Sequence, residues 1–369
     1  MPASILHVDS GKEWRGGQAQ VLHLLCGLKE RRWPQSLVCP PESELGRRAA
    51  AEGIQVQFVP MAGEWDLRAP GRLAAIARKH KSALLHAHAS QAHGICWRAL
   101  RRLPEMALVV TRRVDFAIGK NLLSRWKYLN PRTHYIAISS GVRDVLVRGG
   151  VAPDHISIVH SGIDPQRWHG GVGRKDLIAE FGLPSDSLLI VNVAALTDHK
   201  GQQYLIDAAA QVVKEVPRAR FFIVGEGELR SALQNQIQSL KLSDRVFLTG
   251  FRADVEKFLA GADLFVLSSH LEGLCTSLLD ALWFEKPAIG TRVGGVVDVI
   301  EHEKNGLLVE PKNPRALAEA ILKLLRDPAL ATQMARQARA KIERKFTSEA
   351  MVNGTIGVYE QLMSGLMQS

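Results

Sequence analysis

The sequence contains little that would place the chain in a membrane or outside the cell. Its longest apolar stretches, such as residues 21–26 and 264–267, fall far short of the roughly 18 residues that a membrane-spanning helix needs. Residues 1–8 lack the basic start and the apolar core of a signal peptide. We therefore expect a chain that does not cross a bilayer and that works in the cytoplasm.

Signatures of disulfide and metal proteins are also missing. The four cysteines (Cys26, Cys39, Cys96 and Cys275) form no CxxC pair, which argues against a zinc site, a redox motif or a disulfide framework. They are interpreted as small core residues. No Asp-x-Asp sequence occurs, and the histidines lack the spacing of metal ligands. We expect no metal ion and no other cofactor.

The composition is that of a globular protein with an uneven charge distribution. A chain of 369 residues with 46% hydrophobic and 23% charged residues is long enough for two domains. The net charge is +10, and residues 1–165 contain 23 Lys and Arg against 13 Asp and Glu, while the remainder contains 24 of each. The excess of positive charge in residues 1–165 attracts polyanions, so nucleic acid, an anionic membrane or a phosphorylated acceptor could be the partner.

Short apolar runs alternate with amphipathic stretches along both halves. Strands are expected at residues 5–8, 36–39, 55–59, 84–87, 108–111, 135–138 and 156–159, and again at 188–193, 220–224, 246–248, 264–267, 287–290 and 307–309. Helices are expected at 314–326, 328–346 and 348–363. This alternation predicts two doubly wound α/β halves, with ligands beyond the carboxyl ends of the strands and a large ligand between the halves.

A glycine-containing segment, residues 11–20, follows the first expected strand. It contains Gly16 and Gly17 and precedes an expected helix, so backbone amides could approach a phosphate there. The pattern is not GxGxxG, and a tight turn without a ligand explains it equally well.

Two further segments combine charge with the end of an expected strand. Lys200 follows the strand at 188–193, where an ammonium group could neutralise a diphosphate; alone it would be interpreted as a surface lysine. Glu272 and Asp280 bracket the start of a helix expected from Cys275 onward, where the amides of Leu274, Cys275, Thr276 and Ser277 would bind phosphate. Their carboxylates would accept hydrogen bonds from sugar hydroxyls, although a helix-start Glu and a partly buried Asp are the plainer interpretation.

Residues 271–311, LEGLCTSLLDALWFEKPAIGTRVGGVVDVIEHEKNGLLVEP, resemble the donor-site signature of the retaining family-four glycosyltransferases of the GT-B fold. Further stretches that agree are Gly16-Gly17 and residues 137–140, 160–164, 196–201, 225–229 and 248–251. They cover most of the chain in the order of the family. The resemblance implies two Rossmann-like domains at residues 1–165 and 166–346, with a last helix at 347–369 that returns to the first domain.

The resemblance also implies roles for individual residues. Glu272 would contact the transferred sugar, Asp280 the ribose, and Lys200 the diphosphate, with Glu272 and Lys200 taken as catalytic. Gly250 and Phe251 would lie beside the base, and Gly16 and Gly17 beside the diphosphate.

The chain departs from the family pattern at two positions. Asp280 replaces the usual Glu, and Ala195 stands where the family has an Arg. Arg112 or Arg113 is a candidate to supply the missing cation, because both follow an expected strand. His86 and His88 are candidates for a general base or a sugar contact, against a structural role for each.

We expect metal-independent transfer of a sugar, with retention, from a nucleoside-diphosphate sugar to a hydroxyl of a glycolipid or cell-envelope polysaccharide of the lipopolysaccharide type. The basic first half would hold this anionic or lipid-linked acceptor, in peripheral contact with the inner face of an anionic membrane. Candidate contact patches are residues 29–33, 78–81 and 98–102. Each is also explained as a solvated helix face.

Three alternatives remain open. A sugar-nucleotide epimerase with this fold would convert the donor without an acceptor. A glycan phosphorylase would need a pyridoxal phosphate lysine and a far longer chain. A non-catalytic polyanion-binding protein would explain the charge, but no nucleic-acid-binding module is recognisable, so we expect no nucleic-acid partner.

Overall fold

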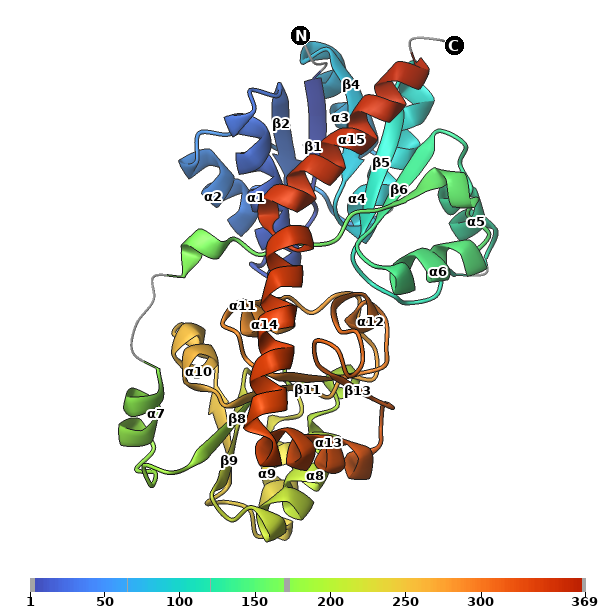
Figure 1. Ribbon diagram of the computed structural model, residues 1–369. Coiled ribbons are helices and arrows are strands. Elements are labelled where there is room, and N and C mark those ends of the chain that lie inside the picture. Colours follow the sequence, from blue (N-terminus) through green and yellow to red (C-terminus); the bar gives the residue numbers. More distant parts are fainter. Residues whose placement is uncertain (1–3, 65, 120, 169–172, 367–369) are drawn as a thin grey trace. The chain divides into compact units, whose positions relative to one another are not determined.

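The computed structural model describes residues 4–64, 66–119, 121–168 and 173–366, and Figure 1 gives its elements. The chain divides into two compact units. The N-terminal unit comprises residues 1–164 together with 347–369, and the C-terminal unit comprises residues 165–346.

The N-terminal unit is a parallel sheet covered by helices. Its strands are β1 (Ser4–Val8), β2 (Gln35–Cys39), β3 (Val56–Phe58), β4 (Ser82–Ala87), β5 (Ala107–Arg112), β6 (Thr133–Ala137) and β7 (Ile156–Ile158). Its α-helices are α1 (Gly16–Glu30), α2 (Glu44–Ala51), α3 (Ala69–Lys79), α4 (Ser90–Ala99), α5 (Leu122–Tyr128), α6 (Ser140–Arg148) and α15 (Ser348–Leu366). The strand order β3-β2-β1-β4-β5-β6-β7 reverses between β1 and β4.

The C-terminal unit repeats this plan. Its strands are β8 (Leu188–Val193), β9 (Ala219–Val224), β10 (Val246–Gly250), β11 (Leu264–Leu267), β12 (Ala288–Thr291) and β13 (Leu307–Val309), in the order β10-β9-β8-β11-β12-β13. Its α-helices are α7 (Arg174–Glu180), α8 (Gln202–Glu215), α9 (Arg230–Ser239), α10 (Val255–Gly261), α11 (Thr276–Trp283), α12 (Val296–Val299), α13 (Pro314–Arg326) and α14 (Pro328–Lys345). All strand pairs in both sheets are parallel, so the expected α/β fold with two doubly wound sheets is confirmed.

The reversal points decide where each sheet can bind a ligand. Strand order reverses between β8 and β11, which pair directly through Leu264 with Ile190 and Phe265 with Val191. In doubly wound sheets the loops that follow the two central strands diverge at this point and leave room for a ligand. The segments after β8 and β11 are therefore the first place to look for a site.

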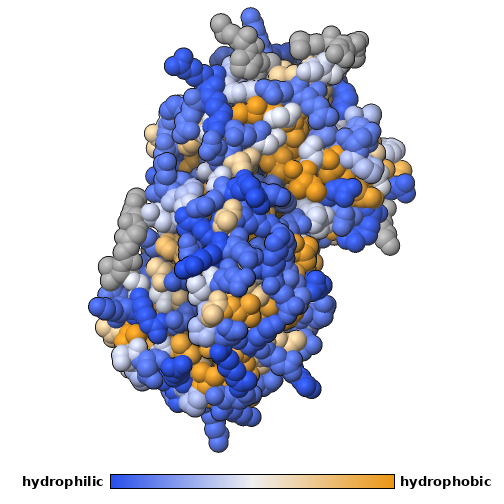
Figure 2. All heavy atoms as spheres, in the orientation of Figure 1, coloured by the Kyte–Doolittle hydropathy of each residue, from blue (hydrophilic) through white to orange (hydrophobic). Residues whose placement is uncertain are grey.

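The surface seen in Figure 2 is mostly hydrophilic, with hydrophobic groups between the polar residues. One such group lies on the side of the N-terminal unit where Figure 1 labels α5 and α6. In the part of the chain that the structure describes, no helix has both the length and the apolar character that crossing a membrane requires.

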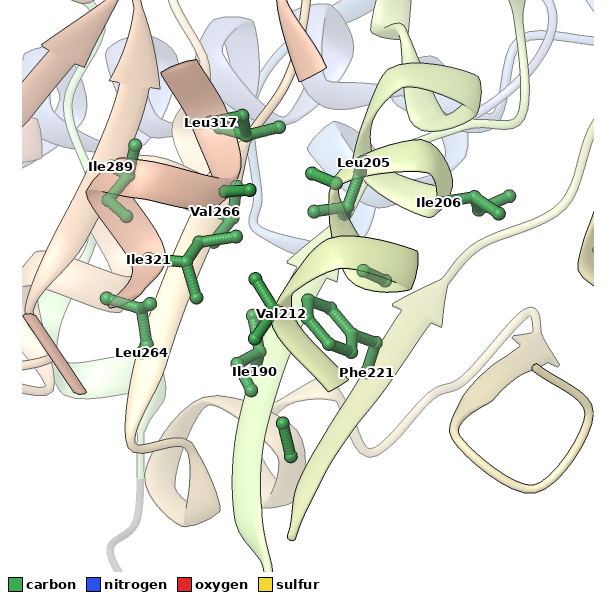
Figure 3. Packing of buried hydrophobic residues seen from close by; sticks show 14 of the residues in the cluster. Ile190, Leu205, Ile206, Val212, Phe221, Leu264, Val266, Ile289, Leu317 and Ile321 are labelled. Carbon is green, nitrogen blue, oxygen red and sulfur yellow. The ribbon is translucent and has the colours of Figure 1, made fainter. Parts of the chain in front are cut away.

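The core of the C-terminal unit lies between the sheet and the helices α8 and α13. Leu205 and Val212 on α8, and Leu317 and Ile321 on α13, recur at helical spacing and are fully or almost fully buried. They pack on strand residues such as Phe221 (Figure 3). Burying a side chain of this size contributes about 2 kcal/mol, so this packing holds the strands that carry the site loops.

Helix α15 completes the core of the N-terminal unit, and Figure 1 shows it across the strands of that unit. Its Met351, Val352, Val358 and Tyr359 are buried in one cluster with residues of β1 and α1. The approach to α1 is close, because a Cβ built on Gly27 would lie 2.6 Å from Val352 Cγ2. The free cysteines Cys39, Cys96 and Cys275 are buried and Cys26 is half-buried, as expected of small core residues.

Candidate active site

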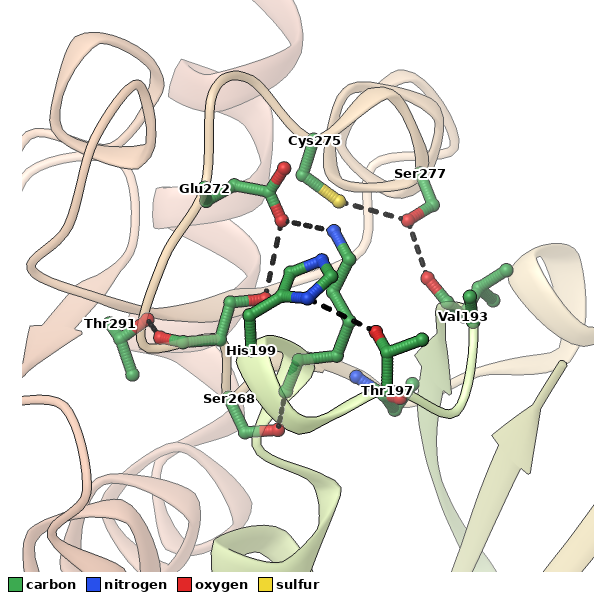
Figure 4. Close-up of polar contacts among 12 residues, drawn as sticks. Val193, Thr197, His199, Ser268, Glu272, Cys275, Ser277 and Thr291 are labelled. Carbon is green, nitrogen blue, oxygen red and sulfur yellow. Dashed lines mark hydrogen bonds and ion pairs between the residues drawn. The ribbon is translucent and has the colours of Figure 1, made fainter. Parts of the chain in front are cut away.

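The two residues predicted to be catalytic contact each other in the C-terminal unit. Lys200 ends a short 3-10 turn (Asp198–Lys200) after β8, and Glu272 lies in the loop after β11. Lys200 Nζ donates to Glu272 Oε2 at 2.5 Å, and the two side chains are 17% and 8% exposed (Figure 4). An ammonium and a carboxylate held together at low exposure form a strong ion pair that a polar ligand can still reach.

A glycine allows this approach of the two loops. Gly201 has a φ of +64°, and a Cβ there would lie 2.3 Å from the Ser268 carbonyl oxygen. Ser268 Oγ also donates to the carbonyl oxygen of Lys200 at 3.0 Å. A side chain at position 201 would therefore push the lysine turn away from the end of β11.

The loop of Glu272 is fixed from three sides. Ser269 Oγ donates to Glu272 Oε2 at 3.2 Å, and the amide of Gly295 donates to the Glu272 carbonyl at 3.1 Å. Thr291 Oγ1, at the end of β12, donates to the Ser269 carbonyl (Figure 4). The carboxylate is thus positioned before any ligand arrives, which lowers the cost of ordering it on binding.

Helix α11 begins at Thr276, with Cys275 as its N-cap. The sequence predicted a helix from Cys275 onward, and the structure places its first residue one position later. The cap makes no side-chain hydrogen bond, and the first turn has no acidic residue, so the helix N-terminus favours an anion. Ser277 Oγ donates to the Val193 carbonyl at 2.7 Å and ties this helix start to the end of β8.

Cys275 and Asp280 are buried at this helix. Cys275 Sγ lies 3.1 Å from Ser277 Oγ. Burial, reinforced by the charge of Glu272, raises the pKa of the Cys275 thiol, so the thiol stays protonated at neutral pH. Asp280 lies one turn into α11, and Ala195, where the family has a cation, is exposed after β8.

The segment after β10 contains the two residues predicted to lie beside the base. Gly250 ends β10 with a φ of +78°, and a Cβ there would lie 2.7 Å from Glu226 Oε1. That carboxylate pairs with Arg230 at 3.1 Å. The side chain of Phe251 is 79% exposed, so its ring is open to a ligand.

In the N-terminal unit, Gly16 and Gly17 begin α1, so this helix starts inside the segment 11–20 that was expected to precede it. No atom lies within 4 Å of a Cβ built on Gly16, and the helix cap makes no side-chain hydrogen bond. Sequence reasoning missed Asp9, whose Oδ1 accepts from the amide of Gly11 at 2.7 Å and shapes the turn before α1. Its signal is an acid directly after the first strand. Burial raises the pKa of the Asp9 carboxyl.

The two candidate arginines differ in what they contact. Arg112 donates to the Val114 carbonyl at 3.1 Å, to the Tyr128 hydroxyl at 2.6 Å and to the Phe116 carbonyl. Each of the three guanidinium nitrogens of Arg112 thus has a protein partner, which favours Arg113 over Arg112 as the candidate cation for a leaving group. Arg113 donates to Ser161 Oγ at 3.3 Å, and burial lowers its pKa to about 10, which leaves it charged at pH 7.

His86 and His88 belong to a buried cluster with His7. His7 Nδ1 lies 3.0 Å from His88 Nε2, and His86 contacts the Tyr359 hydroxyl at 2.5 Å and Thr111 Oγ1 at 2.7 Å. Burial lowers the pKa of His7 to about 3 and the pKa values of His86 and His88 well below their ordinary range. All three are therefore neutral at pH 7 and hold β1, β4 and α15 together.

This cluster corrects the argument that the histidines lack metal-ligand spacing. Ring nitrogens of His7, His86 and His88 lie within 4.8 Å of one another, because β1 pairs with β4 and places His7 beside His86. Both nitrogens of His86 already have protein partners. The absence of a metal from the reaction stays a prediction.

Comparison with known proteins decides the family. Residues 14–167 match the model described as Glycosyltransferase Family 4, and residues 173–341 match the model described as Glycosyl transferases group 1. Together the two models span most of the chain. The chain belongs to the family-four, group 1 glycosyltransferases. Its activity is therefore sugar transfer, and the resemblance inferred from residues 271–311 is confirmed.

Relatives and solved structures agree with this assignment. The chain is 27% identical over 308 residues to N-acetyl-alpha-D-glucosaminyl L-malate synthase of Bacillus anthracis, covering 81% of this chain and 80% of that one. It is 26% identical over 295 residues to UDP-Gal:alpha-D-GlcNAc-diphosphoundecaprenol alpha-1,3-galactosyltransferase of Escherichia coli, covering 76% of each. The crystal structure of HepE of Anabaena in complex with UDP matches with a TM-score of 0.85 at 20% identity, covering 98% and 100% of the two chains. The fold of this glycosyltransferase is GT-B.

Proposed function

We propose that this glycosyltransferase moves a sugar from a nucleoside-diphosphate sugar to a hydroxyl of a lipid-linked or cell-envelope glycan, including acceptors of the lipopolysaccharide type. The observation that carries the proposal is the Lys200–Glu272 pair beside the uncapped start of α11. This arrangement offers a cation and helix amides for a diphosphate, and a carboxylate for sugar hydroxyls.

Binding of the donor would exchange the partners of this pair. The ammonium of Lys200 would move from Glu272 to a phosphate oxygen, and Glu272 would accept a hydrogen bond from the sugar. Ser269 keeps Glu272 in position during the exchange. Lys200 and the amides at the start of α11 would stabilise the charge that develops on the leaving diphosphate, which is the role a metal ion has in metal-dependent transferases. We therefore propose that no divalent ion takes part.

The proposed stereochemical course is retention at the anomeric carbon. The bond from this carbon to the diphosphate breaks while the acceptor oxygen bonds on the same face. The acceptor proton passes to a leaving phosphate oxygen, so no protein base has to take it. The neutral, buried state of His86 and His88 is compatible with this course, because neither is needed as the base.

The names of similar proteins support the proposed substrates. The Escherichia coli relative is named for a UDP-sugar donor and a diphosphoundecaprenol-linked acceptor, and the Anabaena structure contains UDP. An acceptor of this kind lies in a membrane and is anionic, which suits the excess of Lys and Arg in residues 1–165. We propose that the enzyme works in the cytoplasm, in peripheral contact with the inner face of the membrane.

The test is a panel of UDP-, GDP- and ADP-sugars, each with and without EDTA and with a diphosphate-linked lipid acceptor. We expect release of one nucleoside diphosphate that EDTA does not reduce, and an NMR spectrum of the product with the anomeric configuration of the donor. An inverted product would contradict retention, and loss of activity in EDTA would contradict metal independence. No release with any donor would contradict the proposed reaction.

The same panel tests the alternatives. An epimerase would change the donor sugar without an acceptor, and the comparisons give no support to this function. A polyanion-binding protein would leave every donor intact and bind duplex nucleic acid with a steep dependence on salt.

A further inference from the structure

The outward face of α5 is apolar, which is unusual for a short surface helix. Leu122 and Trp126 are 66% and 58% exposed, and Leu129, directly after the helix, is 37% exposed. These residues are four and three positions apart, so they share one face. Leu123 beside them is 46% exposed. Exposed apolar residues that gather in this way mark an interaction surface.

The opposite side of α5 is firmly held by the N-terminal unit. Lys127 is buried and pairs with Glu64 at 2.5 Å. The ring of Tyr128 stacks on Tyr135 at 5.9 Å, and the Tyr135 hydroxyl donates to the Tyr128 carbonyl at 3.0 Å. Asn121 caps the helix by accepting from the amide of Ser124 at 2.8 Å. The apolar face is therefore presented by a fixed helix.

Arginines surround this face. Arg101, Arg125 and Arg132 line a hollow of about 580 Å³ together with Trp97, Leu122, Trp126 and Leu129. Arg125 and Arg148 line a second hollow on the side of α6. In the described part of the chain, no acidic side chain forms an ion pair with Arg101, Arg125 or Arg148, which are all exposed. The acid Asp115 also lines the second hollow, so arginines outnumber acids around the apolar face and give it a net positive charge that an anionic surface would complement.

We propose that this surface, the α5 patch (Leu122, Leu123, Arg125, Trp126 and Leu129), docks on an anionic lipid bilayer. Leucine and tryptophan side chains would enter the region between headgroups and acyl chains, and the arginines would contact lipid phosphates. A partner protein would need acidic groups against the same arginines, whereas a membrane offers phosphate and hydrocarbon together. This inference deepens the proposed function, and it rests on that function for the presence of the acceptor in a membrane.

The α5 patch also revises the contact patches expected from sequence. Residues 98–102 contribute Arg101 to the hollow beside Trp126. Residues 29–33 and 78–81 contribute nothing to either hollow. The apolar segment that accompanies the arginines comes from α5, whose leucines and tryptophan have the composition of a core segment.

The test is sedimentation of the full chain with vesicles that contain no acceptor. One set contains equal parts of phosphatidylglycerol and phosphatidylcholine, and the other contains phosphatidylcholine alone. We expect binding to the anionic vesicles to be at least about ten-fold stronger, because several arginines contribute. Leu122→Gln and Trp126→Gln should each weaken it about ten-fold, since each removes an apolar side chain that docking would bury in the bilayer. Arg125→Gln should weaken it about five-fold, and only on the anionic vesicles.

Matched controls are Leu240→Gln and Arg336→Gln, which change an exposed leucine and an exposed arginine of the C-terminal unit. Both should bind vesicles as the unmodified chain does. Equal binding by Leu122→Gln and the unmodified chain, or no preference for anionic vesicles, would overturn the proposal. So would a dimer in sedimentation velocity that Trp126→Gln dissociates, because the patch would then belong to a second copy.

Thermal stabilisation by UDP-, GDP- and ADP-sugars is measured on the same samples. It separates the two proposals, because vesicle binding requires no donor. Vesicle binding without stabilisation by any donor would contradict the proposed function and leave the α5 patch standing. Stabilisation by one donor without vesicle binding would support the proposed function and contradict membrane docking by the α5 patch.

Discussion

The two units use their polar residues in opposite ways. In the C-terminal unit, Lys200 and Glu272 contact each other beyond the carboxyl ends of the central strands β8 and β11, beside an uncapped helix start. In the N-terminal unit, Arg112 and His86 are buried and contact protein groups. The first arrangement suits a small charged ligand, whereas the second strengthens the fold and leaves recognition to the surface.

The two units also differ in how the charged side chains on their surfaces are paired. In the C-terminal unit, cations lie beside acids, as in the cluster of Arg252 and Lys257 with Glu180 and Asp254. In the N-terminal unit, Arg101 and Arg125 lie beside leucine and tryptophan side chains. Paired charges cancel at a distance, and clustered arginines do not, so we expect an anionic surface to be attracted by the N-terminal unit rather than by the C-terminal unit.

The two units should differ most in their stability in acid. Burial lowers the pKa values of five histidines of the N-terminal unit, which are His7, His86, His88, His93 and His134. Below pH 6.5 the histidines of the unfolded chain take up protons. In the folded chain His7, His86 and His88 stay neutral, because burial lowers their pKa values. Stability is therefore complete above about pH 6.5 and falls with decreasing pH, by up to about 4 kcal/mol per pH unit for three histidines.

Hydrogen exchange at pH 7 and pH 5 measures this effect for each unit. We expect protection to decrease first in the N-terminal unit. His88→Gln should flatten its pH dependence, and His80→Gln, at a half-exposed histidine, should not. Earlier loss of protection in the C-terminal unit would show that the buried histidines do not make the N-terminal unit the more acid-sensitive one.

A smaller effect should separate the two neighbouring arginines. Arg112→Gln removes hydrogen bonds to Tyr128 and two carbonyls, so the free energy of unfolding should fall by about 2 kcal/mol without a change in turnover per folded molecule. Arg113→Gln should instead lower turnover about ten-fold and affect stability less. Denaturant titration and initial rates measure both quantities. Unchanged turnover in Arg113→Gln would show that Arg113 does not stabilise the leaving diphosphate.

The smallest expected effect concerns the missing cation of the C-terminal unit. Ala195 is exposed after β8, so Ala195→Arg has room to add a second positive charge near Lys200. We expect the dissociation constant for the preferred nucleoside diphosphate to fall about ten-fold in calorimetric titration. Ala340→Arg, at an exposed site on α14, should leave it unchanged. Equal affinities in the two variants would place the diphosphate away from position 195.

Much of the fold could be predicted from sequence, because apolar runs bounded by Gly and Pro mark parallel strands directly. The motif around Glu272 also located its loop correctly after β11. The ion pair with Lys200 could not be predicted, because it depends on the left-handed Gly201 and its approach to Ser268.

The N-terminal unit was less predictable for three physical reasons. The histidine cluster depends on β1 pairing with β4, which separation along the chain does not reveal. Arg112 and Arg113 are adjacent, so sequence could not tell which one contacts Tyr128. The leucines and tryptophan of α5 have the composition of a core segment, and only the fold shows that they are exposed.

The assignment of the Lys200–Glu272 pair as the donor site is tested by the initial transfer rates of Lys200→Met and Glu272→Gln. Lys323→Met, which removes an exposed ion-paired lysine of the same unit, is the control. Below the unfolding midpoint of every variant, we predict at least about a 100-fold loss of kcat in both site variants and none in the control. Rates equal to those of the unmodified enzyme in either site variant would contradict the account.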